Sequence, residues 1–181
     1  MTDSTRREED EGRMEPVDFR QVFDTEFSYV WNTLRRLGVR ESDLKDQAQE
    51  VFLTVHGLLD DYDRQRPLRP WLFAIAWRCA ARYRALPRFR REVVGETVEP
   101  PDQARSADEQ VAVREAQALF LRALEEVEPS RRAVFVMAEV DEQPVPRIAE
   151  ALGIPLNTVY SRLRLAREDF ARAARRLRST R

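Results

Sequence analysis

The chain has 181 residues, a formal net charge of −1 at pH 7 and one cysteine, Cys79. This length suits one or two domains with modest cores, and a lone cysteine excludes an internal disulfide and argues against a structural zinc site. No segment reaches the roughly 20 apolar residues of a membrane span, and the charged N-terminus lacks a signal-peptide run, so we expect a cytoplasmic protein without membrane insertion.

Although the net charge is small, acidic and basic residues cluster in different segments of the chain. Residues 62–91 hold nine arginines against Asp63 alone, and residues 160–181 hold eight against Glu168 and Asp169. Residues 1–18 hold seven acids and three arginines, whereas residues 92–109 hold six acids and one arginine. Two basic bodies flanked by acidic segments are compatible with nucleic-acid binding, which needs locally clustered Lys and Arg.

Helical periodicity dominates the chain, because no segment alternates at period two for long and five glycines leave little material for hairpin turns. We predict an all-α fold of two small helical domains joined by a flexible linker. The expected order is an acidic disordered tail (1–16), a first domain (17–91), an acidic linker (92–110) and a second domain (111–178). Helices are expected near 17–37, 41–60, 70–86, 111–127, 129–141, 144–152 and 156–176.

The expected helix 41–60 has a polar face opposite its apolar stripe. The stripe contains Leu44, Val51 and Val55 among others, so Asp43, Asp46, Gln49 and Glu50 lie on the opposite side. An exposed acidic and amide patch cannot favour DNA. The pattern indicates a basic protein surface as the partner, although many charged faces only meet water.

The next helix carries aromatic residues on two sides. Trp71, Ile75 and Cys79 share one side, whereas Phe73, Trp77 and Arg84 point the other way. Aromatic rings beside arginines suit unstacked bases, because stacking tolerates any base and Arg holds the backbone. Packing against another helix is the alternative for Phe73 and Trp77, and the sequence leaves it open.

The stretch from Ile148 to Arg167 has the pattern of a helix-turn-helix. Gly153 stands where a tight turn needs positive φ, and Pro155 suits the first turn of the helix that follows. On that helix the apolar side chains gather on one side, and the other side is chemically suited to base edges in a major groove. The predicted apolar side contains Val159, Leu163, Ala166, Phe170 and Ala173, and the opposite side contains Asn157, Ser161, Arg164, Leu165, Glu168 and Arg172.

Catalysis by this chain alone is not expected. His56 has no Cys, Ser or second His to form a triad or metal site, and no Gly-rich phosphate loop is present. We therefore predict no catalytic residues, no metal ligands and no cofactor.

The motifs together resemble the extracytoplasmic-function (ECF) group of bacterial sigma factors. Their order and spacing carry the resemblance, which runs from about Phe19 to Arg176. The matching motifs are Asp43-x-x-Asp46-x-x-Gln49-Glu50-x-Phe52, Trp71-Leu72-Phe73-x-Ile75-Ala76, Ile148-Ala149-Glu150-x-Leu152-Gly153 and Thr158-Val159-x-Ser161-Arg162-Leu163.

The resemblance implies a role for each domain. The first would be sigma region 2, which binds the β′ clamp helices of core RNA polymerase through Asp43, Asp46, Gln49 and Glu50 and captures and melts the minus-10 element. The second would be region 4, which reads the minus-35 element and touches the β flap, and an anti-sigma factor is a further implied partner. The implied minus-10 residues are Tyr62, Arg64, Arg66, Arg69, Trp77, Arg78 and Arg84. The implied minus-35 residues are Asn157, Thr158, Tyr160, Ser161, Arg162, Arg164, Leu165 and Arg167.

Two positions depart from the family pattern, with Arg78 where Asn is frequent and His56 where an aromatic residue is frequent. The first leaves the identity of the minus-10 base open, because Asn and Arg offer different donors and acceptors. The alternative function is a free-standing helix-turn-helix regulator that binds duplex DNA without polymerase, usually as a dimer. No dimerisation segment supports that alternative.

Overall fold

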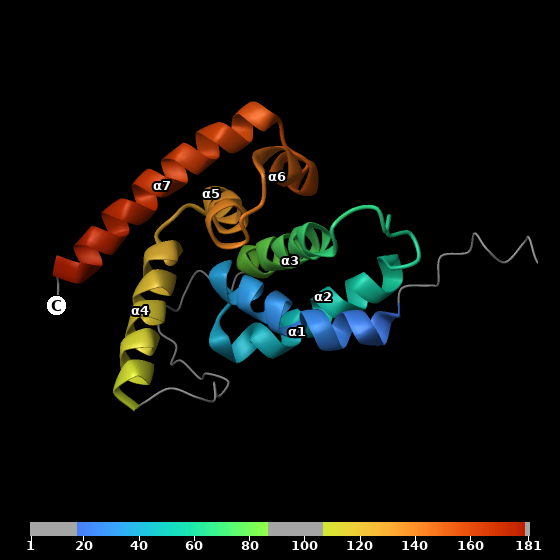
Figure 1. Cartoon of the computed structure of the whole chain (residues 1–181), viewed down its shortest axis with the longest axis horizontal. Helices are drawn as coiled ribbons and strands as arrows, with labels where there is room; N and C mark the ends of the chain where they lie inside the picture. Colours follow the sequence, from blue (N-terminus) through green and yellow to red (C-terminus); the bar gives the residue numbers. More distant parts are fainter. Residues whose placement is uncertain (1–17, 87–106, 180–181) are drawn as a thin grey trace, which may run out of the picture.

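The computed structural model describes residues 18–86 and 107–179, and every regular element in these ranges is helical, which confirms the predicted all-α class (Figure 1). The expected tail and most of the expected linker lie outside the described residues. None of the helices described is long and apolar enough to cross a membrane. The elements are α1 (Phe19–Arg36), the 3-10 turn η1 (Glu41–Asp43), α2 (Leu44–Leu58), α3 (Leu68–Ala85), α4 (Ala107–Glu125), α5 (Pro129–Phe135), the π-helical turn η3 (Val136–Val140), α6 (Val145–Leu152) and α7 (Leu156–Ser179).

The first domain is a bundle of α1, α2 and α3. Helix α1 begins where the Asp18 carboxylate accepts a hydrogen bond of 3.0 Å from the backbone N–H of Arg20. Its buried residues pack against the predicted stripe of α2, in which Leu44, Val51 and Val55 are each fully buried. Burying such a stripe against a neighbour supplies most of the stability of a short amphipathic helix.

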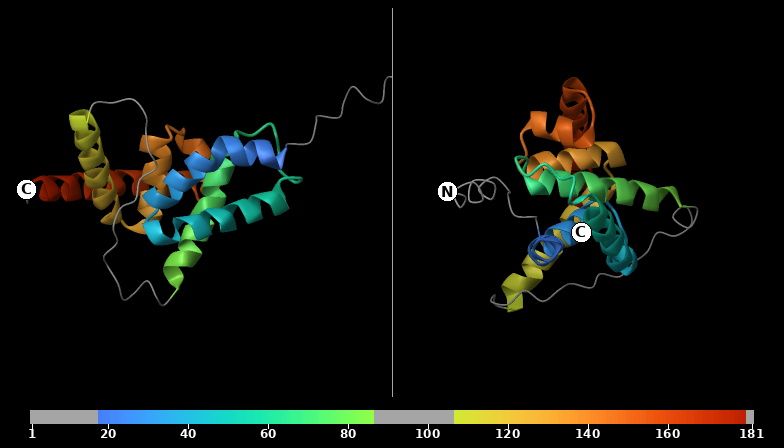
Figure 2. Two further views of the ribbon diagram at one scale, coloured as in Figure 1. Left: turned by 90° about the horizontal axis from the view of Figure 1, so that it is seen from below. Right: turned by 90° about the vertical axis from the view of Figure 1, so that its right-hand side faces the viewer.

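Helix α3 packs against helices of both domains. In the right-hand view of Figure 2 it runs between α1 and α2 below and α6 above. Its apolar side chains are buried by these neighbours, and Phe73, Ile75 and Ala80 retain at most 1% exposure. The open choice for Phe73 is therefore settled in favour of packing.

The second domain is held by α7, which packs along α4, α5 and α6. The Phe170 ring stacks on Phe135 with centroids 4.9 Å apart and meets Phe120 edge-on at 5.4 Å. Four of the five residues predicted for the apolar side of this helix are buried, and Phe170 is half-buried in these ring contacts. Helix α5 begins at Pro129, after Glu128, whose carboxylate accepts the N–H groups of Ser130 and Arg131.

Helix α4 begins at Ala107, so the helix expected near 111–127 starts four residues earlier, within the stretch expected to be linker. The physical reason is the composition Ala107-Asp108-Glu109-Gln110, because acids favour the first turn of a helix and Ala, Glu and Gln propagate it.

The helix-turn-helix is formed by α6 and α7 around Gly153. Gly153 has φ 65° and ψ 36°, the predicted left-handed conformation, and its N–H donates to the carbonyl of Glu150 at the end of α6. Pro155 lies just before α7, and its carbonyl accepts the N–H groups of Thr158 and Val159. The turn thus fixes the angle between the two helices.

Gly153→Ala is expected to lower the free energy of unfolding by about 1 kcal/mol, because an L residue is strained at positive φ. An added Cβ would meet nothing within 4 Å, so the loss would be conformational and not steric. Urea unfolding followed by circular dichroism measures it.

Gly57→Ala is the matched control, since a Cβ there also meets nothing within 4 Å but the residue lies in α2 without positive φ. This variant should gain about 0.5 kcal/mol. Equal effects from the two substitutions would contradict the assigned backbone strain.

Candidate functional surfaces

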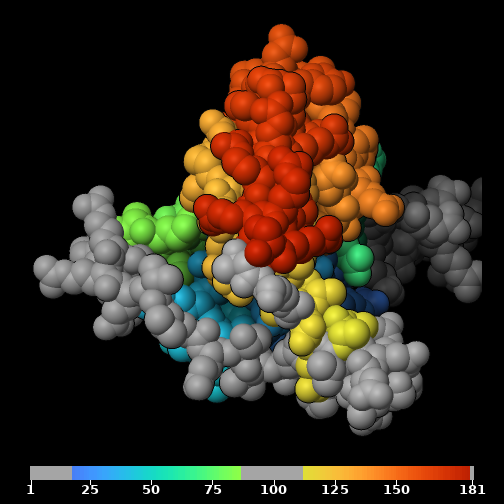
Figure 3. All heavy atoms as spheres, turned by 90° about the vertical axis from the view of Figure 1, so that its left-hand side faces the viewer, coloured from blue at the N-terminus to red at the C-terminus, as the bar shows by residue number. Residues whose placement is uncertain are grey.

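The outward face of α7 carries most of the residues predicted to read DNA. Asn157, Ser161 and Arg164 are exposed, and Tyr160 keeps 55% exposure. Thr158, Arg162 and Leu165 are half-buried at the margins of this face. In the space-filling view of Figure 3, α7 forms a ridge on the face of the molecule towards the viewer. A ridge of amide, hydroxyl and guanidinium groups has the donors and acceptors that base edges require.

The arginines of this ridge are held by exposed carboxylates. Arg164 pairs with Glu168 at 2.7 Å, one turn along the helix, and Arg167 pairs with Glu139 at 2.7 Å. Both arginine side chains remain at least 60% exposed. Such surface pairs contribute little stability, so either guanidinium can exchange its partner for a phosphate or a base at small cost.

The polar face predicted on α2 is exposed at Asp46, Gln49 and Glu50. Asp43 differs, because it lies in η1 and its carboxylate accepts a 2.6 Å hydrogen bond from the Tyr83 hydroxyl. Burial, and next the hydrogen bond to Asp43, raises the pKa of this phenol. Asp43 therefore fixes α3 to the start of α2, and the outward polar face consists of the other three residues.

The loop between α2 and α3 brings part of the predicted minus-10 set together. The ring of Tyr62 lies 4.7 Å from that of Trp71, and its hydroxyl donates to the carbonyl of Arg66. Trp71 and the exposed Arg78 line one pocket with Arg66. Two aromatic rings beside two guanidinium groups form a platform suited to an unstacked base. Arg64 is half-buried in the same loop.

Arg69 lies at the start of α3 and faces α1. Its Nε donates to the Glu26 carboxylate at 2.9 Å, and its guanidinium lies 5.0 Å from the ring centroid of Tyr29. The hydrogen bond and then the charge of Glu26 raise the pKa of Arg69. Arg69 remains 59% exposed, so these contacts orient it without removing it from solvent.

Trp77 and Arg84 form a separate cluster on another side of α3. The Arg84 guanidinium lies 4.9 Å from the Trp77 ring, and Nη1 donates to the carbonyl of Leu37 at 2.6 Å. Burial lowers the pKa of Arg84. The structure therefore does not bring these two residues together with Trp71 and Arg78, and it gives Arg84 a packing role that its sequence position did not indicate.

Three exposed or half-exposed apolar residues were missing from the predicted sets. Leu53 is 60% exposed and follows Gln49 and Glu50 on α2, and Leu156 is 43% exposed at the start of α7. Trp71 shares one side of its helix with the buried Ile75 and Cys79 but is only half-buried. Helical spacing places Leu53 on the same face as Gln49 and Glu50, because it lies one turn after them.

His56, the one histidine, takes part in an aromatic cluster. Its ring meets Phe19 edge-on at 4.9 Å, and Phe19, Phe23 and Phe27 each contact Phe52. The imidazole ring of His56 therefore packs at a position where the family frequently has an aromatic residue. Within the described ranges, no group of three His, Cys, Asp or Glu side chains is placed to hold a metal ion.

Family comparisons match both domains in order. The model for sigma-70 region 2 matches residues 23–92, and the model for sigma-70 region 4 matches residues 117–170. The RNA polymerase sigma factor CnrH of Cupriavidus metallidurans is 31% identical over 148 residues, which cover 76% of each chain. The ECF RNA polymerase sigma factor SigL of Mycobacterium tuberculosis is 30% identical over 148 residues, covering 81% of this chain and 83% of SigL.

Solved structures agree with this assignment. CnrH, in its complex with the cytosolic domain of CnrY, has a TM-score of 0.57 at 26% identity and 84% coverage of both chains. The sigma factor RpoE of Bartonella quintana, in its complex with the anti-sigma factor NepR, shares the fold with a TM-score of 0.65 at 18% identity, over 87% of this chain and 97% of that one. The chain belongs to the extracytoplasmic-function group of the sigma-70 family of RNA polymerase sigma factors.

Proposed function

We propose that this chain binds core RNA polymerase, directs it to promoters with minus-35 and minus-10 elements, and helps to melt the DNA without catalysing any bond change itself. The observation that carries the proposal is the presence of two chemically opposite surfaces on one chain of this family. One is the acidic and amide face of α2, and the other is the basic ridge of α7. A factor that joins a protein machine to DNA needs both.

The ridge of α7 is proposed to enter the major groove at the minus-35 element. Asn157 and Ser161 are exposed near the start of α7, and Arg164 extends that line by about one turn. The N-terminal residues of a recognition helix are those that reach base edges, whereas flanking arginines contact phosphates. Arg162 and Arg167 lie at the margins of the face and fit the second task.

The face of α2 is proposed to dock on the clamp helices of the β′ subunit, and the second domain on the β flap. Asp46 and Glu50 are exposed one turn apart, with Gln49 beside them. Carboxylates in this arrangement favour a basic partner and repel DNA. The exposed Leu53 would add an apolar contact at the edge of the same face.

The platform of Tyr62, Arg66, Trp71 and Arg78 is proposed to hold a flipped base of the minus-10 element. Its rings offer stacking surface, and its guanidinium groups offer contacts to the backbone of a single strand. An anti-sigma protein is a further proposed partner, since the compared CnrH and RpoE structures are both complexes, the second with a named anti-sigma factor.

Transcription with purified core polymerase tests this function directly. Transcript starts mapped after overexpression would supply a matching promoter. We expect specific transcripts only when the chain is added. Tight operator binding without polymerase, together with no polymerase-dependent transcript, would favour the free-standing regulator instead.

The double variant Asp46→Arg with Glu50→Arg should weaken core-polymerase binding by more than about 100-fold, because like charges would face the basic partner. Co-purification and fluorescence anisotropy measure the loss, and circular dichroism checks that helicity is unchanged. The matched control is Asp24→Arg with Glu115→Arg, an equal charge change at exposed positions of α1 and α4. Unchanged binding by the first double variant would reject the α2 assignment.

Arg164→Ala should cost about 1 to 3 kcal/mol of discrimination between the promoter and mutated minus-35 sites if its guanidinium grips a guanine. Arg175→Ala is the control, because residue 175 lies three turns further along the same side of α7 and is also exposed. Competition binding of holoenzyme to the two DNAs gives the ratio. Equal losses on all DNAs would make Arg164 a phosphate contact.

A further inference from the structure

One arginine of the α7 ridge is held by a carboxylate from another element. Nε and Nη2 of Arg167 donate to Oε1 of Glu139, at 2.9 and 2.7 Å. Glu139 lies on the π-helical turn η3, 28 residues earlier in the chain. The side chain of Arg167 is 60% exposed and that of Glu139 37%, so the pair lies at the surface, beside the residues proposed to read DNA.

The other arginine pair of the ridge is of a different kind. Arg164 donates to Glu168 through Nη1, and both residues lie on α7 one turn apart. Such a pair moves with its own helix, and the guanidinium can turn about the single bond. Two bonds from a planar guanidinium fix its plane and direction more firmly, as they do for Arg167. The three remaining N–H groups of Arg167 then point in set directions and are available to a further partner.

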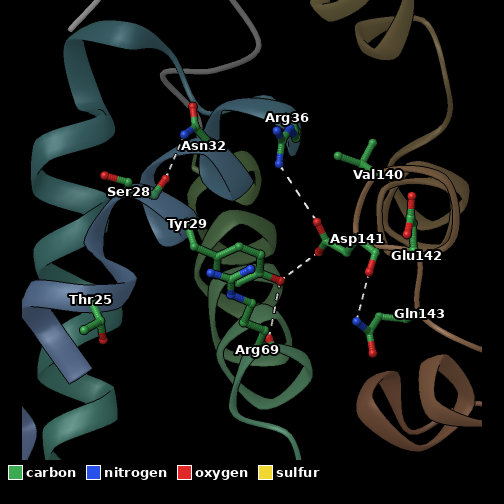
Figure 4. Close-up of a pocket in the computed structure, with 10 residues that line it drawn as sticks. All are labelled: Thr25, Ser28, Tyr29, Asn32, Arg36, Arg69, Val140, Asp141, Glu142 and Gln143. Atoms are coloured by element: carbon green, nitrogen blue, oxygen red, sulfur yellow. Dashed lines mark hydrogen bonds and ion pairs between the residues drawn. The ribbon is translucent and has the colours of Figure 1, made fainter. Parts of the chain in front are cut away.

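The turn that carries Glu139 is fixed within the second domain. Val136, at the start of η3, is fully buried, and its carbonyl accepts the N–H of Asp141 at 3.0 Å. Figure 4 shows the side-chain amide of Gln143 bonded back to the carbonyl of Asp141, whose carboxylate also accepts a 2.7 Å hydrogen bond from the Tyr29 hydroxyl of the first domain. A carboxylate on so constrained a turn can hold an arginine in one place.

We propose that Glu139 is a positioning residue for promoter recognition, which holds the Arg167 guanidinium in the orientation that meets one backbone phosphate of the minus-35 element. This role rests on the function proposed above, because it requires α7 to enter a major groove. Phosphate contacts set the register and orientation of a recognition helix on the duplex. Glu139 thus contributes to DNA binding through the arginine and not by touching DNA.

A fixed arginine favours one register of DNA over all others. On the promoter, base contacts hold α7 at one place in the groove, and an arginine already oriented for that place loses little side-chain entropy on binding. On unrelated DNA no base contact sets the register, so the affinity comes from phosphates wherever they lie. A restrained guanidinium reaches fewer of these phosphates, and the carboxylate beside it repels them. Specificity is a difference of affinities, so both effects raise the preference for the promoter.

Competition binding measures this preference as the ratio of holoenzyme affinities for the promoter and for an unrelated duplex of equal length. The holoenzyme is assembled from core polymerase and the full-length chain. Glu139→Ala should lower the ratio by roughly two- to fivefold, the effect of losing an exposed ion pair. Glu139→Gln keeps an acceptor for Arg167 without the charge, so its ratio should lie between those of the wild type and Glu139→Ala. Thermal unfolding checks that the variants remain folded.

Glu142→Gln is the matched control for charge. Glu142 is exposed on the same turn, three residues after Glu139, and is not the carboxylate that holds Arg167. Its substitution should leave the ratio unchanged. A drop as large as that of Glu139→Gln would mean that only the local charge matters, and the positioning role would be overturned.

A double-mutant cycle shows whether Glu139 acts through Arg167. Once Arg167→Ala has removed the guanidinium, adding Glu139→Ala should change the ratio no further. An equally large effect of Glu139→Ala in both backgrounds would overturn the role, as would an unchanged ratio when Arg167 is present.

Salt dependence separates positioning from a general weakening of the domain. On unrelated DNA, the Glu139→Ala holoenzyme should bind more tightly than the wild type. The slope of log affinity against log salt concentration should steepen by up to about 0.9, the value of one added phosphate contact. Weaker binding to both DNAs with an unchanged slope would assign Glu139 to the fold alone and reject its role in positioning.

A failure of the proposed function would give a different result. The wild-type holoenzyme would then prefer no promoter and make no promoter-specific transcripts, and the role of Glu139 would fall with it. A wild type that prefers its promoter, beside Glu139 variants with the same ratio, would reject the role of Glu139 alone.

Discussion

Helix α3 packs against both domains and connects their apolar cores. Phe73 and Ala80 lie on one side of this helix and Ile75 on the other, and all three are buried. A fully buried side chain of the size of Phe or Ile contributes roughly 1.5 to 3 kcal/mol. Because α1 and α2 of the first domain and α6 of the second all contact α3, the described residues of the two domains form one continuous apolar core.

The solvent-exposed surface carries separate acidic and basic regions. The face of α2 is acidic, the ridge of α7 is basic, and the platform beside α3 combines rings with guanidinium groups. Because the acidic and basic side chains lie on different helices, the acidic face can attract a basic protein surface and the basic ridge can attract DNA. The net charge of −1 does not prevent this. Where the two domains meet, Glu150 of α6 forms an ion pair with Arg66 of the platform, so this arginine is not free of acidic partners.

Local patterns predicted local structure well. The turn at Gly153 and the buried side of α7 depend on periodicity and on one backbone conformation, both of which a sequence displays directly. Contacts between distant segments were missed. Nothing near Asp43 indicates that it accepts from Tyr83, and nothing near Tyr29 points to a carboxylate 112 residues away. The hydrogen bond from Arg84 to the carbonyl of Leu37 is another contact of this kind, because it depends on tertiary packing.

Helix α7 is continuous for 24 residues, which makes it a rod about 36 Å long. Its first turns carry the groove-reading side chains, whereas Phe170 and Arg176 near the far end anchor it to α4. A tilt of roughly 10° about Arg176 would displace Asn157, 19 residues away, by about 5 Å, or roughly one and a half base-pair steps. Alignment on the promoter is therefore set in part by the packing of α4, a helix that need never touch DNA.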